Sequence, residues 1–170
     1  MTTIDPAASD GLATTLTSDR VWRELAKASF AVLSHVTPGG VPRSSGVVYA
    51  VADRRLYVVV ADDSWKARHI TANGHVAVTV PVRRGGVLSL LFPIPPATIS
   101  FRASAVVYGG GTRPDHPLPS QLAALLPAER RDEGSIIEIH PVGQFVTYGL
   151  NVSLRQMRDP ALARHRVPVG

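Results

Sequence analysis

"FAVLSHVTPGGVPRSSGVVYAVADRRLYVVVA" (residues 30–61) contains three apolar runs that are joined by two short turn signals. The runs at 30–36, 41–51 and 56–61 are rich in valine and other residues that favour strands, whereas TPGG and ADRR are typical of tight turns. Such short turns predict antiparallel strands, because a parallel connection needs a dozen or more residues. The stretch therefore predicts an antiparallel β-meander.

The strand pattern continues toward the C-terminus. HVAVTVPV at 75–82 places alternate valines on one face, ATISFRASAVVYG at 97–109 alternates over its length, and a last long strand is predicted at 134–150. The helices that a doubly wound sheet requires are missing between most strands. We therefore predict a mainly β chain with a few short helices, folded as a small closed or split β-barrel of six antiparallel strands.

Helical spacing predicts three short helices. The first begins at Ser18 or Asp19, either of which can cap it. Its apolar face consists of Val21, Trp22, Leu25 and Ala28. The others are predicted at 64–72 and within 120–131. We expect residues 1–17 to be a flexible segment, 18–152 the barrel domain, and 153–170 a tail that is irregular or briefly helical.

Composition narrows the classes of function. The chain has 45% hydrophobic and 18% charged residues and no cysteine, which fits a folded domain without disulfides or thiolate chemistry. No apolar run is long enough for a membrane span, and the N-terminus has no secretory signal pattern, so we expect a cytoplasmic protein. The net charge is +5, but the basic residues are scattered and only 6% of residues are aromatic. A small anionic ligand fits this charge at least as well as a nucleic acid, and the low aromatic content argues against base stacking, so we expect no nucleic-acid partner.

Residues for catalysis or metal binding show no recognisable pattern. The six histidines lack metal-ligand spacing, no serine lies in GxSxG, and no paired carboxylates indicate hydrolysis. We therefore predict no metal site and name no catalytic residue. A chain without its own acid–base set often takes its chemistry from a cofactor.

The stretch ADDSWKARH at 61–69 has two interpretations. Asp62, Asp63 or Ser64 can cap the helix that follows. Lys66 and Arg68, however, lie in the first turn, where the helix dipole disfavours cations. Free amides, a hydroxyl, an ammonium and a guanidinium together bind phosphate well. The residues alone leave a simple helix start and a phosphate site as alternatives.

A second unusual stretch is RSSG at 43–46. Gly46 weakens a strand unless something approaches its backbone closely, so either a planar ligand or a β-bulge would explain it.

The order of these pieces resembles the pyridoxamine 5′-phosphate oxidase-like family of FMN-binding split barrels. The motifs GGVP, SWKARH and NGHVAV stand in the family's order and spacing, and the resemblance covers about residues 20–150. Only two of the 18 basic residues are lysines, a bias that indicates a GC-rich source of actinobacterial type. Two departures stand out. His69 replaces the family's usual Asn, and the tail lacks the Trp of true pyridoxamine phosphate oxidases.

The resemblance implies a homodimer that binds FMN or the deazaflavin coenzyme F-420. It implies that the flavin ring lies near Ser45, Gly46, Val47, Val59 and Val60, with Arg43 as a further candidate. It places the phosphate at Ser64, Lys66 and Arg68. The implied activity is hydride transfer to or from a small organic substrate, other than the true pyridoxamine phosphate oxidase reaction. The alternative is a non-catalytic carrier of flavin, haem or lipid. For the apolar loop 85–96 three roles stay open: it lines a substrate pocket, it closes the dimer, or it packs against the barrel as an ordinary loop.

Overall fold

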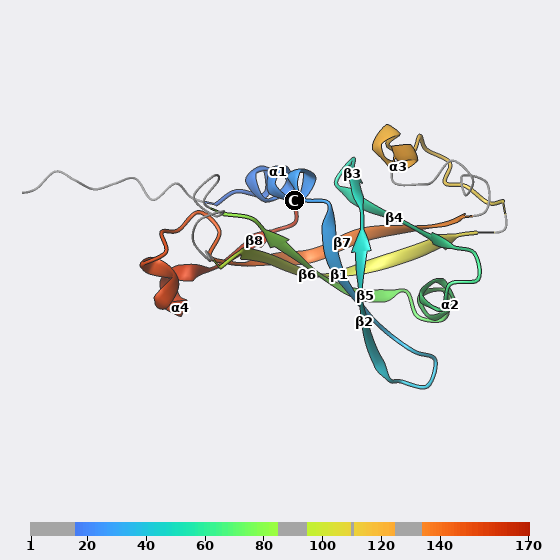
Figure 1. Ribbon diagram of the computed structural model, residues 1–170, viewed down its shortest axis with the longest axis horizontal. Helices are drawn as coiled ribbons and strands as arrows, with labels where there is room; N and C mark the ends of the chain where they lie inside the picture. The colour runs from blue at the N-terminus through green and yellow to red at the C-terminus, as the bar shows by residue number, and fades with distance from the viewer. Residues whose placement is uncertain (1–15, 85–94, 110, 125–133) are drawn as a thin grey trace, which may run out of the picture.

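The computed structural model describes residues 16–84, 95–109, 111–124 and 134–170. Within these ranges, short helices surround one strongly curled antiparallel sheet (Figure 1). The strands are β1 Phe30–Val36, β2 Pro42–Val48, β3 Ala50–Ala52, β4 Arg55–Ala61, β5 His75–Val82, β6 Ala97–Tyr108, β7 Gly134–Tyr148 and β8 Arg164–Pro168. The helices are α1 Ser18–Lys27, α2 Trp65–Ala72, α3 Ser120–Ala124, the 3-10 helix η3 Gln156–Arg158 and α4 Pro160–Ala163.

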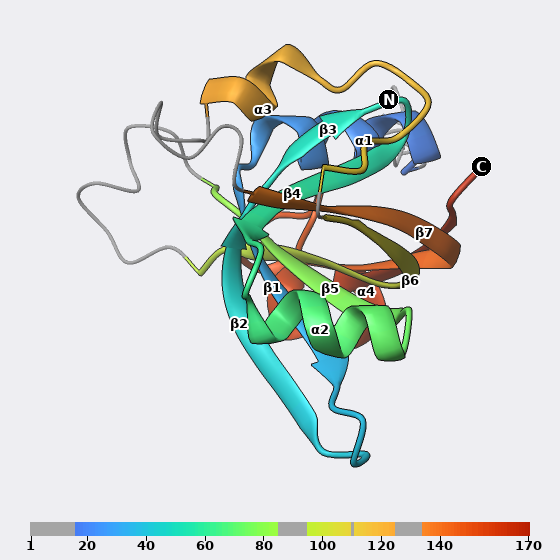
Figure 2. The ribbon, with the colours of Figure 1, turned by 90° about the vertical axis from the view of Figure 1, so that its right-hand side faces the viewer.

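The sheet closes on itself through its two ends. Its strand order is β2-β1-β5-β6-β7-β4-β3, and β8 also pairs with β7. Only Tyr49 separates β2 from β3 along the chain, so the first and last strands in this order meet (Figure 2). β3 pairs with β4 only over Arg55–Tyr57. Among the described residues, Val58–Ala61 of β4 pair with β7 along one edge and with no strand along the other edge. The barrel is split along this unpaired edge, between β4 and β2.

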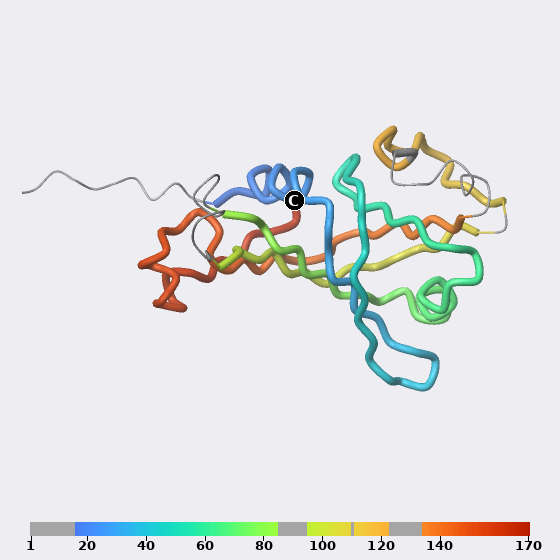
Figure 3. The backbone as a smooth tube through the Cα atoms, viewed as in Figure 1, coloured from blue at the N-terminus to red at the C-terminus, as the bar shows by residue number. Residues whose placement is uncertain are grey.

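The barrel encloses the main hydrophobic core. The inner faces of β1, β5, β6 and β7 contribute it, and α1 closes one end. Trp22 of α1 contacts the Phe145 ring edge-on with 5.4 Å between centroids, and Phe145 contacts Phe101 at 5.3 Å. The hydroxyl of Ser18 and the indole of Trp22 both donate to the carbonyl of Val169. The C-terminus therefore lies against α1 (Figure 3).

The outer face of β4 and β7 carries a smaller core. Tyr57 and Ile136 lie there with Ala50 and with Leu122 of α3. Consequently β7 is buried on both faces from Gly134 to Ile139, which explains why its sequence there does not alternate between apolar and polar residues.

The predicted mainly β barrel is confirmed, and most strand boundaries agree within two residues. The strand count was wrong, because the described residues form eight strands rather than six. The single run predicted at 41–51 is broken at Tyr49, whose hydroxyl donates to the carbonyl of Leu25. β8 lies in the tail, where we expected only irregular or helical structure, although η3 and α4 are helical as predicted.

The start of α1 also differs from the prediction. Thr17, rather than Ser18 or Asp19, is the N-cap, and its hydroxyl accepts from the amide of Arg20 at 3.3 Å. The predicted face of Val21, Trp22 and Leu25 is buried, while Ala28 is half-buried.

Some expectations lie outside the described residues. They concern the flexible segment up to residue 15, residues 85–94 of the apolar loop, and the end of the helical stretch at 120–131, of which α3 is described.

Candidate functional site

A hollow of about 400 Å³ lies in the split between β2 and β4. Its walls come from the end of β2, the second half of β4 and the start of α2. It is lined by Gly46, Val47, Val48, Val58, Val59, Val60, Ala61, Ser64 and Lys66. Six of the nine predicted cofactor residues are in this set, so the structure brings them together.

The start of α2 leaves its hydrogen-bonding groups available. Ser64 is at the N-cap position, but its side chain makes no capping hydrogen bond. Asp62 does not cap the helix either, because its carboxylate accepts a 2.6 Å hydrogen bond from the Ser135 hydroxyl. The first-turn amides of a helix have no intrahelical acceptors. Ser64 and the half-buried Lys66, at the start of this helix, therefore adjoin one hollow.

Arg68 lies elsewhere. It lines a separate hollow of about 550 Å³ together with Asp62, Thr71 and Ser135. Two residues along an α-helix turn the side chain by about 200°, so Lys66 and Arg68 point to opposite sides of α2. The structure does not bring Arg68 together with Ser64 and Lys66.

Arg43 and Ser45 do not line the hollow either. Arg43 is exposed near the β1–β2 turn. Ser45 is half-buried next to Gly46, and its hydroxyl is buried without a hydrogen-bond partner among the described residues. An unsatisfied buried hydroxyl beside the hollow can serve a ligand.

The structure explains Gly46 differently from our expectation. A Cβ built at position 46 would lie 2.8 Å from the ring of Phe30, so the ring of a neighbouring strand fills this space. The β1–β2 ladder is regular through Gly46, which excludes the β-bulge, one of the two alternatives for this glycine.

Three aromatic rings that the sequence analysis did not assign to the site lie beside Lys66. The ring centroid of His35 on β1 lies 5.3 Å from that of Trp65 and 5.4 Å from that of His69. The centroids of Trp65 and His69 are 5.5 Å apart. Nε2 of His35 lies 3.3 Å from Nδ1 of His69. Burial, followed by the charges of His69 and Lys66, lowers the pKa of His35. The histidine in place of the family's Asn at position 69 was the only signal for this cluster.

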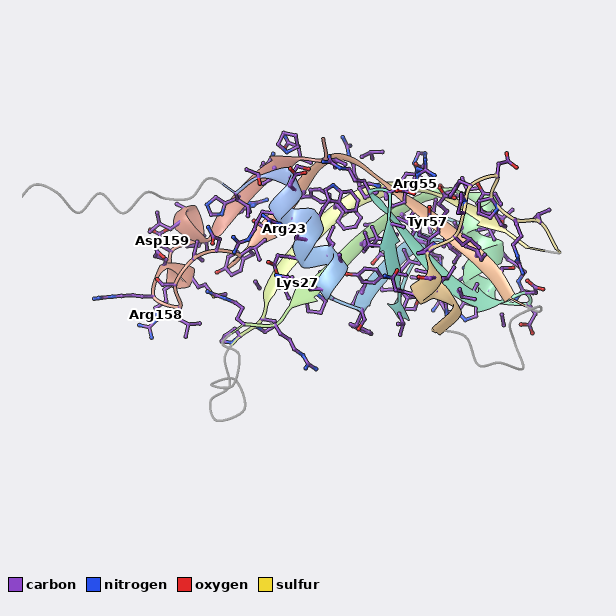
Figure 4. The ribbon with its side chains drawn as sticks, turned by 90° about the horizontal axis from the view of Figure 1, so that it is seen from above. Arg23, Lys27, Arg55, Tyr57, Arg158 and Asp159 are labelled. Carbon is purple, nitrogen blue, oxygen red and sulfur yellow. The ribbon has the colours of Figure 1, made fainter. Side chains whose placement is uncertain are left out.

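A second polar cluster surrounds Glu138 on the outer side of β4 and β7. This carboxylate is 1% exposed and lies 3.0 Å from Nη1 of Arg55 and 2.9 Å from Nε2 of His140. His116 reaches it at 3.4 Å and also contacts the Tyr57 hydroxyl at 2.8 Å. Arg55 and Tyr57 extend side by side from β4 (Figure 4). The hydrogen bond to Tyr57, and then the charge of Glu138, raise the pKa of Arg55.

No described helix is long and apolar enough to cross a membrane. Among the described residues, no group of three or more potential ligand side chains is arranged to hold a metal ion.

Known proteins resemble this chain in structure. A scan against protein-family models and a search of curated proteins find no match. A pyridoxamine 5′-phosphate oxidase candidate from Listeria innocua is 18% identical, with a TM-score of 0.57 over 79% of this chain and 98% of that chain. An F420 reductase is 23% identical, with a TM-score of 0.50 over 72% and 93%. The haem storage protein HutZ from Vibrio cholerae is 16% identical, with a TM-score of 0.55 over 79% and 96%.

These similarities define the class of fold. The chain has the split-barrel fold of pyridoxamine 5′-phosphate oxidase-like proteins, so the resemblance seen in the sequence is confirmed in the architecture.

Proposed function

We propose that the chain is an oxidoreductase that binds FMN or coenzyme F-420 in the hollow between β2 and β4, and that its substrate is a small organic molecule. The observation that carries this proposal is the convergence of Ser64 and Lys66 on a hollow between two strand edges. An uncapped helix start with a neighbouring ammonium favours a phosphate group.

The hollow also suits a planar ring. Valine side chains of β2 and β4 line it, and an unpaired strand edge offers alternating amide donors and carbonyl acceptors. The ring of a flavin or deazaflavin has apolar faces and a polar edge that match these two kinds of surface. The unsatisfied hydroxyl of Ser45 adds a hydrogen-bonding group next to the hollow.

The residues of the chain would act by binding and positioning. When bound, a flavin or deazaflavin supplies hydride transfer. Ser64, Lys66 and the first-turn amides of α2 would hold the phosphate, and the valines would exclude water from one face of the ring. Among the residues that the structure describes, Lys66 and Ser64 are the only ones lining the hollow with polar side chains, so this described lining supplies no carboxylate or imidazole as a base.

This sparse polar lining also favours a second candidate function. A non-catalytic carrier of flavin, haem or lipid needs a binding surface but no acid–base group. The similarity to HutZ, a haem storage protein, supports this alternative. Reduction of the bound cofactor by a nicotinamide or other hydride donor would favour the enzyme, whereas stable binding without reduction by any donor would favour the carrier.

We further propose that the protein is a homodimer. Phe30, Val41 and Val48 lie on or beside β1 and β2 and remain exposed. Neighbouring large apolar side chains at a surface are typical of an interface. Light scattering after gel filtration should give twice the chain mass of 18.1 kDa. A mass of one chain at micromolar concentration would contradict the dimer.

The phosphate assignment is tested by replacing Lys66. Lys66→Ala should weaken FMN or F-420 binding by about 10- to 100-fold, because a hydrogen bond to a charged group contributes about 1.5–3 kcal/mol. Lys27→Ala is the matched control, since Lys27 is the other lysine and lies exposed on α1. Arg68→Ala should have a smaller effect than Lys66→Ala. Equal affinities of wild type and Lys66→Ala would refute the site.

A further inference from the structure

The ammonium of Lys66 is placed by an aromatic ring. Nζ of Lys66 lies 5.1 Å from the centroid of the Trp65 ring, within cation–π distance. A lysine side chain otherwise has a large rotamer entropy, which an anion would have to reduce on binding. The indole therefore restricts the positions of the ammonium, and Lys66 also lines the hollow.

The Trp65 ring is in turn supported by two imidazoles. It is 40% exposed and contacts the rings of His35 and His69. His35 is 2% exposed, and its Nδ1 is buried without a hydrogen-bond partner among the described residues. Its Nε2 faces Nδ1 of His69 at 3.3 Å, so one proton can lie between the two rings.

The charges around this pair come mainly from α2. Burial is the largest cause of the lowered pKa of His35, and the charges of His69 and Lys66 lower this pKa further. Across the β1–β2 ladder the register partner of His35 is the exposed Arg43, and across β1–β5 it is the uncharged Val76. An anion bound to Lys66 would offset the positive charge that opposes protonation of the pair.

We propose that Trp65 is a positioning residue for the Lys66 ammonium, and that the His35–His69 pair takes up a proton when an anion binds there. This inference rests on the proposed function, because it requires an anion at Lys66. Linkage is reciprocal: if the anion favours the protonated pair, the protonated pair binds the anion more tightly. Cofactor affinity is thereby coupled to pH by residues that do not line the hollow.

The coupling can be measured without any cofactor. A protonated imidazole quenches indole emission, so tryptophan fluorescence should fall as the pH is lowered. Sulfate is the probe, because its charge does not change over this range. In wild type, saturating sulfate should raise the pH midpoint of this fluorescence decrease by about half a pH unit. Such a shift corresponds to about threefold coupling between binding of the anion and binding of the proton. Lys66→Ala should abolish the sulfate shift, and Trp65→Phe should abolish the quenching step.

The positioning role has a separate test. Trp65→Leu should weaken FMN binding about three- to tenfold, the range expected for loss of a cation–π contact. In the Lys66→Ala background the same substitution should have no further effect. Riboflavin, which lacks the phosphate, should bind equally well to wild type and Trp65→Leu.

The outcomes separate this inference from the proposed function. A sulfate-independent midpoint, or equal losses from Trp65→Leu with and without Lys66, would overturn the inference. If FMN binding still depends on Lys66, the proposed function survives that result. If sulfate shifts the midpoint but neither FMN nor F-420 binds, the coupled anion site stands and the cofactor assignment fails.

Discussion

The ring of Phe30 on β1 occupies the space in which a side chain at position 46 on β2 would lie. The Cε2 atom of Phe30 is 2.8 Å from the ideal Cβ position of Gly46. Real Cβ atoms do not approach other atoms this closely, so any larger residue requires the ring to move. The glycine is therefore explained by packing within the chain, even though it also borders the hollow.

This packing predicts a coupled effect on stability. Gly46→Ala should lower the free energy of unfolding by up to about 1 kcal/mol, below the cost of overpacking a core, because the Phe30 ring must move but is 47% exposed and can turn toward solvent. In a Phe30→Ala background the clash is absent, and Gly46→Ala should be neutral or stabilising because alanine reduces the entropy of the unfolded chain. Urea denaturation of the four proteins measures the coupling. An equal loss in both backgrounds would show that Phe30 is not the cause.

The strands were predictable because their signals are local. A period of two in HVAVTVPV and short turns around the valine runs fix both element type and direction. β8 was missed because RHRVP at 164–168 carries only one buried apolar side chain and is defined by its pairing with β7. Such a pairing depends on tertiary structure, which local propensity does not contain.

The candidate site was likewise predictable only where its residues are close together in the sequence. Ser64 and Lys66 are near neighbours in a local motif, and they do adjoin one hollow. Arg68 belongs to the same motif but lies on the opposite side of α2, because the helical period separates it from Lys66. In the Glu138 cluster, Arg55 is 83 positions from Glu138 and Tyr57 is 59 positions from His116, so no local pattern could reveal these contacts.

The buried Glu138 carboxylate should stabilise the fold. Glu138→Gln leaves the Arg55 guanidinium without its charged acceptor at 3.0 Å. Since Arg55 is 34% exposed and water can partly replace the carboxylate, we expect a loss of about 1–3 kcal/mol rather than the full cost for a buried pair. Chemical denaturation of wild type and Glu138→Gln measures this loss in the free energy of unfolding.

The matched control is Glu24→Gln, which removes only helix-surface pairs with Arg20 and Lys27 and should cost below about 1 kcal/mol. Similar losses for the two variants would contradict the structural role of Glu138.

His35 should make the fold sensitive to acid. Burial and the neighbouring His69 and Lys66 lower its pKa in the folded state, so the unfolded chain binds the proton more tightly. Between the lowered pKa and the ordinary value of 6.5, the unfolded state holds more protons, and stability must fall as the pH falls through this window. We expect a lower melting temperature at pH 5.5 than at pH 7.5.

His35→Phe should reduce this decrease, whereas His75→Phe at an exposed position of β5 should retain it. An unchanged pH dependence in His35→Phe would exclude His35 as its source.

The most direct test of the central claim is a fluorescence titration of the purified full chain with FMN and, separately, with coenzyme F-420. We predict saturable binding of at least one of them, with an affinity that falls in Lys66→Ala and is retained in Lys27→Ala. If neither cofactor binds the wild-type protein, the hollow between β2 and β4 is not a flavin or deazaflavin site.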